Sequence, residues 1–146
     1  KVSKGTENMM RKPAMTREQA ALAVCRGVET AVELAQMGYD IIVTGEMGIG
    51  NTTTSSAVAA ALLSCDPKEI TGKGAGLSDT ALLRKIAVVE EGIQMHELYQ
   101  ADAFDVLCAV GGSPDFPACL SAVPWHMCRW LLTESSVRWL RLRRSG

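Results

Sequence analysis

Residues 44–54 read TGEMGIGNTTT and lie between a β-branched run at residues 39–43 (YDIIV) and an alanine-rich run at residues 53–64. The first run is typical of a buried parallel strand, and the second predicts a helix that packs closely on its neighbours. A strand, a glycine-rich turn and a helix start together form a common anion-binding arrangement. Glycines let the backbone approach a phosphate, and free N–H groups at the helix start point towards it. We therefore predict an anion-binding loop here.

The flanking sequence predicts further helices around this loop. Residues 16–19 (TREQ) match a capping box, and helical apolar spacing follows as far as Gly38. Ser78 or Asp79 is expected to cap another helix that runs to about Gly92, after a break at residues 66–70. Residues 93–101 are expected to form a linker or a short helix.

A second buried strand is predicted over residues 103–110 (AFDVLCAV), just before two glycines. The predicted order is then helix, strand, helix, helix, strand. This order indicates an α/β fold with a doubly wound, Rossmann-like parallel sheet and flanking helices.

Size and composition indicate a globular domain. The chain has 146 residues, of which 47% are hydrophobic and 21% charged, and its net charge is -1. That charge gives no electrostatic reason to expect nucleic acid or a membrane surface as partner. Five cysteines without ligand spacing are expected to be reduced thiols in a core. With a polar N-terminus and no signal peptide, we expect a cytoplasmic protein.

The loop at residues 44–54 differs from the two best-known phosphate loops. Gly45 and Gly50 have the spacing of a Walker A loop, but Asn51 stands where its lysine belongs. The dinucleotide fingerprint GxGxxG fails as well, because Thr53 occupies the position of the third glycine. A monophosphate is therefore favoured over a triphosphate. A glycine-rich turn without any ligand is the alternative.

A second glycine cluster, Gly72-Lys73-Gly74-Ala75-Gly76, also precedes a predicted helix. Lys73 in this loop and Lys85 on the helix are candidate partners for a phosphate, although Lys85 by itself is more typical of a solvated surface residue. In the first loop, Glu46 would repel a bound phosphate, so it is expected to face a sugar hydroxyl or a developing positive charge, or else to be a surface residue.

No metal or other cofactor site is expected. His96 and His126 have no Cys, His or paired acid at ligand spacing, and we interpret both as non-catalytic.

Several motifs in residues 1–112 together resemble nicotinate-nucleotide–dimethylbenzimidazole phosphoribosyltransferase, an enzyme that activates the lower ligand of cobalamin. The matching segments, in order, are residues 5–8 (GTEN), 13–16 (PAMT), 45–53 (GEMGIGNTT), 72–77 (GKGAGL), 84–87 (RKIA), 104–107 (FDVL) and 110–112 (VGG).

The resemblance implies a homodimer with a parallel α/β sheet. It also implies transfer of phosphoribose from nicotinate mononucleotide to 5,6-dimethylbenzimidazole, without a cofactor. The backbone around residues 48–53 would hold the 5′-phosphate together with the second loop and Lys85, and Glu46 would lie near the reacting ribose. The implied substrate-binding residues are Glu46, Gly48, Gly50, Asn51, Thr52, Thr53, Gly74, Gly76 and Lys85.

The chain departs from the family pattern at two places. It lacks the family's N-terminal portion, and residues 113–146 form an aberrant tail that we attribute to a frameshift, which the nucleotide sequence would test. No segment matches the one that carries the family's catalytic base, a glutamate. Residues 1–112 are thus expected to be the central part of an incomplete domain, inactive alone. The alternatives are a non-catalytic phosphate- or nucleotide-binding module and an unstable remnant.

Overall fold

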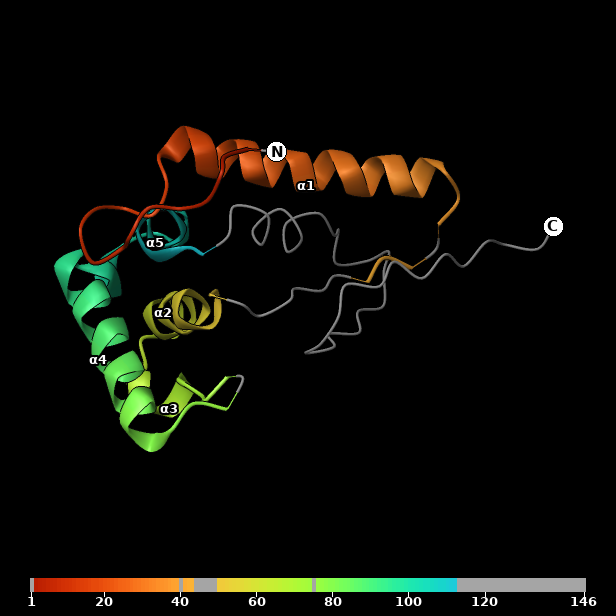
Figure 1. Cartoon of the computed structure of the whole chain (residues 1–146). Helices are drawn as coiled ribbons and strands as arrows, with labels where there is room; N and C mark the ends of the chain where they lie inside the picture. The colour runs from red at the N-terminus through yellow and green to blue at the C-terminus, as the bar shows by residue number, and fades with distance from the viewer. Residues whose placement is uncertain (1, 40, 44–49, 75, 113–146) are drawn as a thin grey trace.

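Five α-helices and one short 3-10 helix make up most of the computed structural model, which describes residues 2–39, 41–43, 50–74 and 76–112 (Figure 1). In chain order they are α1 (Arg17–Gln36), α2 (Thr52–Leu63), α3 (Pro67–Ile70), α4 (Asp79–Met95), the 3-10 helix η1 (Leu98–Gln100) and α5 (Ala103–Val110). The predicted tail, residues 113–146, and the greater part of the first glycine loop, residues 44–49, lie outside the described residues.

Helix α1 begins as its sequence predicts. Thr16 Oγ1 accepts a hydrogen bond from the Gln19 backbone N–H at 3.2 Å, and Gln19 Oε1 accepts one from the Thr16 N–H at 3.0 Å. Gly38 follows the helix with φ +82°, a conformation that glycine adopts without strain. The face that α1 buries consists of small residues, namely Ala20, Ala23, Gly27 and Ala31.

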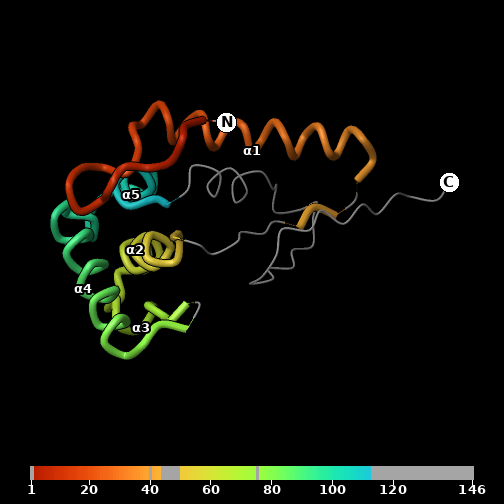
Figure 2. The backbone as a smooth tube through the Cα atoms, in the orientation of Figure 1, coloured from red at the N-terminus to blue at the C-terminus, as the bar shows by residue number. Residues whose placement is uncertain are grey.

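Helix α2 lies at the centre of the described structure. Figure 2 shows it between α5 on one side and α3 on the other, with α4 alongside. Its buried residues Ala57, Ala60 and Ala61 are small, so the neighbouring helices approach closely. The main core cluster joins these alanines to larger side chains of α4 and α5, including Val89, Ile93, Val106 and Val110.

Of the helices that follow α2, α4 agrees with the sequence in type and differs in extent, whereas α3 stands where a break is predicted. Residues 66–70, predicted as a break, hold the single turn α3, which Asp66 caps. Ser78 is the N-cap of α4, as predicted, and α4 continues beyond Gly92 to Met95. It continues because Gly92 is buried against the side chain of Met9, so the glycine serves close packing rather than helix termination.

The strand predicted over residues 103–110 is wrong, because these residues form α5. The Asp102 side chain accepts a hydrogen bond from the Asp105 N–H at 2.8 Å and so starts a helix. Within α5, Val106, Ala109 and Val110 are buried, whereas Asp105 reaches an ion pair with Arg17 of α1. An eight-residue apolar run fits a buried helix as well as a buried strand, and the cap decides between them.

No strand forms among the residues that the structure describes. Tyr39 forms a single β-bridge, and residues 41–43 have no regular secondary structure. The predicted strand at residues 39–43 and the predicted parallel sheet are therefore not seen in this part of the chain. A strand needs a neighbouring strand for its backbone hydrogen bonds, and with residues 103–110 helical the described ranges offer none.

Two further expectations concern the surface. The described cysteines are free, but they do not share a core: Cys108 is buried, Cys65 is half-buried and Cys25 is exposed. Cys25 thus contradicts the expectation of core thiols, because it lies on a face of α1 that no described helix covers. Of the helices in the described ranges, none combines the length and the apolar character needed to cross a membrane.

Candidate functional site

The first turn of α2 has backbone N–H groups that its own N-cap side chain does not cap. Asn51 is the N-cap residue of α2, and its side chain makes no capping hydrogen bond. In contrast, α1, α3, α4 and α5 are each capped by a Thr, Ser or Asp side chain. Uncapped N–H groups and the positive end of the helix dipole together favour an anion.

Lys85 of α4 brings a cation to this helix start. Its ammonium donates to Thr52 Oγ1, on the first residue of α2, at 3.0 Å and to the Gly72 carbonyl at 2.9 Å. The residue is only 7% exposed, and in the described residues it belongs to no ion pair. A lysine ammonium has three N–H donors, so one donor remains after these two bonds.

Burial has an electrostatic consequence for Lys85. Removal of the ammonium from water disfavours its charged form, so the pKa of Lys85 lies below its ordinary value. Neutral partners such as a hydroxyl and a carbonyl compensate this desolvation less well than an anion does. A negatively charged ligand bound at this site would therefore be stabilised by the buried ammonium of Lys85.

The second glycine cluster lies against the same helix start. A Cβ atom added to Gly74 would come within 3.4 Å of Thr52 Oγ1 and 3.8 Å of Lys85 Nζ. Gly74 also has φ +56°, which favours glycine at this position. Backbone from residues 72–74, the start of α2 and the Lys85 ammonium thus converge, although they are far apart in the sequence.

The chain after α5 approaches the first turn of α2 as well. A Cβ atom on Gly112 would overlap Thr54 Oγ1, and that hydroxyl itself donates to the Asn51 carbonyl at 2.8 Å. Gly112 therefore permits a close backbone approach that a residue with a side chain would prevent.

The structure brings together part of the predicted set. Thr52, Gly74 and Lys85 meet directly, Asn51 occupies the N-cap position of the same helix without a side-chain cap, and Thr53 is the second residue of α2. Gly50 precedes the helix with φ +78°, and Gly76 has φ +96° with open space around it. Glu46 and Gly48 lie outside the described residues, so their placement stays a prediction.

Lys85 is buried, so its interpretation as a solvated surface residue is wrong, because the acceptors that hold it come from residues remote in sequence. Lys73 is exposed and forms an ion pair with Asp79 at 2.6 Å, and its contact with a phosphate stays a prediction. The sequence does not identify the Gly72 carbonyl as an acceptor for Lys85, since a backbone acceptor leaves no signal in the sequence.

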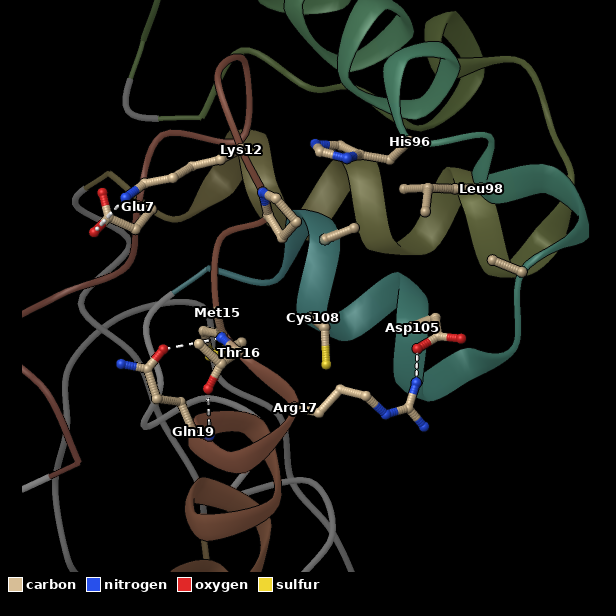
Figure 3. Close-up of a pocket in the computed structure, with 13 residues that line it drawn as sticks. Glu7, Lys12, Met15, Thr16, Arg17, Gln19, His96, Leu98, Asp105 and Cys108 are labelled. Atoms are coloured by element: carbon tan, nitrogen blue, oxygen red, sulfur yellow. Dashed lines mark hydrogen bonds and ion pairs between the residues drawn. The ribbon is translucent and has the colours of Figure 1, made fainter.

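A separate pocket of about 700 Å³ lies where the start of α1 meets α5 and the loop at residues 7–13 (Figure 3). Its charges are already paired, with Lys12 to Glu7 at 3.1 Å and Arg17 to Asp105. His96 also lines this pocket, and its Nε2 contacts the Met9 carbonyl at 2.8 Å. The pocket contains none of the predicted substrate-binding residues.

The chain is similar to proteins of one known family. A family model described as phosphoribosyltransferase matches residues 1–119. The chain is 46% identical over 112 residues to the nicotinate-nucleotide–dimethylbenzimidazole phosphoribosyltransferase of Ruminiclostridium cellulolyticum, and 47% identical over 112 residues to that of Alkaliphilus metalliredigens. Each alignment covers 77% of this chain and 32% of the relative.

Among solved structures, the crystal structure of CobT from Thermus thermophilus is similar, with a TM-score of 0.72 and 36% sequence identity. The match covers 81% of this chain and 35% of that one. The chain therefore spans about a third of the length of the proteins that it matches.

Proposed function

Because the chain belongs to the phosphoribosyltransferase family whose model matches residues 1–119, we propose that the site at the start of α2 holds the 5′-phosphate of nicotinate mononucleotide. The observation that carries this proposal is Lys85: a buried ammonium without a carboxylate partner among the described residues, hydrogen-bonded at an uncapped helix start. A phosphate would accept from the remaining Lys85 N–H and from the α2 backbone N–H groups.

The proposed reaction of the family-length protein is transfer of phosphoribose to 5,6-dimethylbenzimidazole. The bond between the anomeric carbon and the nicotinate nitrogen breaks, and its electron pair stays with that nitrogen. A benzimidazole nitrogen forms the new bond to the anomeric carbon from the opposite face. The attacking nitrogen is the unprotonated one, and a general base accepts the proton of the other ring nitrogen, so the products are nicotinate and α-ribazole 5′-phosphate. The phosphate site would contribute by orienting the ribose for attack.

No residue of the described ranges is assigned as that base. Glu46 is proposed to lie near the ribose, where a carboxylate would stabilise positive charge developing on the sugar. We further propose for the family-length protein a doubly wound parallel sheet, a homodimer and a cytoplasmic location. For the 146-residue chain itself we propose binding of nicotinate mononucleotide without turnover.

Calorimetric titration of the 146-residue chain tests this proposal. We expect saturable binding of nicotinate mononucleotide, weaker binding of nicotinate riboside, which lacks the phosphate, and no hydrolysis of ATP. Incubation with both substrates should release no α-ribazole 5′-phosphate. Turnover would refute the inactive fragment, and ATP hydrolysis would refute the monophosphate site. Absence of any binding together with a non-cooperative melt would indicate the unstable remnant instead.

Binding should depend on pH through Lys85. A phosphate monoester is a dianion above about pH 8, so any loss of affinity at higher pH reports the protein. Since burial lowers the pKa of Lys85, we expect the affinity to fall as pH rises through that lowered pKa, where the ammonium becomes neutral. A Lys85→Arg variant should show no such fall, because a guanidinium stays charged. If the affinity of Lys85→Arg falls in the same way as pH rises, the fall is caused by a group other than Lys85.

The same pKa shift affects the ligand-free protein with the opposite sign. Between the lowered pKa and the ordinary one, the unfolded chain binds more protons at Lys85 than the folded chain does. The free energy of unfolding due to this residue therefore rises with pH in that window. As pH rises, the affinity should thus fall while the contribution of Lys85 to the free energy of unfolding rises. A general loss of structure at alkaline pH would lower both.

A further inference from the structure

Two buried side-chain oxygens lack a hydrogen-bond partner in the part of the chain that the structure describes, and both lie next to the acceptors of Lys85. They are Asn51 Oδ1 and Thr71 Oγ1, on residues that are 8% and 6% exposed. Asn51 directly precedes Thr52, and Thr71 directly precedes Gly72. Each unpaired group is therefore carried by the residue that directly precedes an acceptor of the Lys85 ammonium.

An unpaired buried hydroxyl is costly, because it has lost its water without gaining another partner. The other threonine hydroxyls near α2 are used: Thr54 Oγ1 donates to the Asn51 carbonyl, and Thr52 Oγ1 accepts from Lys85. Only the backbone of Thr71 is engaged, its N–H donating to the Pro67 carbonyl at 2.9 Å as the C-cap of α3. Nothing in the described protein explains why a hydroxyl is kept there.

We infer that Thr71 is a further positioning residue of the anion site, whose hydroxyl gains its hydrogen bond when the phosphate group is bound. The inference rests on the proposed function. A hydroxyl donates to a phosphate oxygen directly or through one ordered water. That bond would hold the peptide that joins α3 to Gly72, and the Gly72 carbonyl in turn holds Lys85 at 2.9 Å.

The positioning role predicts effects of opposite sign on binding and on stability. Valine has the shape of threonine without its hydroxyl, so Thr71→Val removes an unpaired group from the ligand-free protein. We expect its melting temperature without ligand to be equal to or above that of the wild type. Its affinity for nicotinate mononucleotide, measured by calorimetric titration, should fall about tenfold, as for loss of one hydrogen bond to a charged group.

Two more variants complete the experiment. Thr71→Ser retains a hydroxyl and should retain the affinity to within about threefold. Thr30→Val, on the exposed middle of α1, removes a hydroxyl that bonds the Arg26 carbonyl and should leave the affinity unchanged. Both serve as controls for the loss of the Thr71 hydroxyl.

The possible results separate this inference from the proposed function. Wild-type binding with unchanged affinity in Thr71→Val overturns the role of Thr71 and leaves the phosphate site standing. If Thr71→Val has a lower melting temperature without ligand and Thr71→Ser has that of the wild type, the hydroxyl is purely structural. That result also overturns the positioning role of Thr71. If the wild type does not bind nicotinate mononucleotide, the proposed function fails and the inference fails with it.

Discussion

We expect replacement of Lys85 by methionine to lower the affinity of the chain for nicotinate mononucleotide by about a hundredfold or more. The ammonium is buried and offers its free donor beside the uncapped start of α2, so a bound phosphate would pair with a desolvated charge. Loss of one partner from such a pair costs about 2–5 kcal/mol. Methionine fills a similar volume, which keeps the packing between α2 and α4. Titration calorimetry with circular dichroism measures affinity and folding on one sample.

Lys68 offers a matched control for Lys85. Its side chain is two-thirds exposed, and its nearest carboxylate, that of Glu90, is 3.9 Å away. Because an exposed pair at this distance contributes little, Lys68→Met should bind as the wild type does. Equal losses in the two variants would indicate an effect of overall charge, and equal retention would exclude Lys85 as the phosphate partner.

We expect Gly111→Ala to lower the stability of the folded chain by about 3 kcal/mol, which is typical of overpacking at a buried backbone position. A Cβ atom there would overlap the Leu107 carbonyl oxygen and lie 2.9 Å from Met15 Cε. The carbonyl belongs to the last turn of α5 and already accepts the Gly111 N–H at 2.9 Å, so it cannot move without loss of that bond. A thermal melt should show a midpoint at least about 10 °C lower.

Gly5→Ala is the control for this effect. A Cβ atom on Gly5 meets nothing within 4 Å, so the variant should melt within about 2 °C of the wild type. The expected loss in Gly111→Ala arises from backbone contact, so a Met15→Ala change that relieves only the side-chain contact should not restore it. A Gly111→Ala protein that melts like Gly5→Ala would show that the turn after α5 adapts to a side chain.

The starts of α1 and α4 could be predicted because their signals are short and local. Thr16 and Gln19 lie three residues apart and bond each other, and Ser78 bonds the Ala81 N–H in the same way. These bonds form wherever the sequence places the right side chain before an apolar run. The end of α4 lies at Met95, beyond the predicted Gly92, because it depends on a contact that is not local. Gly92 packs on Met9, and that contact spans most of the described chain.

The segment at residues 103–110 marks where the sequence pattern stops being decisive. Eight mostly apolar residues leave strand and helix equally possible, because both bury such a run. Asp102 held the deciding signal, a cap for the Asp105 N–H, and the Arg17 to Asp105 ion pair then joins α5 to α1. The expectation of a sheet within these residues relied on the strand interpretation, and it was not met in the described ranges.

By itself, the sequence determined that a glycine-rich turn precedes a helix of small residues, and that a second glycine cluster precedes another helix. Both follow from local chemistry, since glycine conformations and helix caps depend on neighbours within a few residues. Only the tertiary structure decided that these two segments meet. It places Lys85 against Thr52, 33 residues earlier, and against Gly72, 13 residues earlier. Such contacts depend on how α2 and α4 pack, and helix packing is set by the whole core rather than by any local pattern.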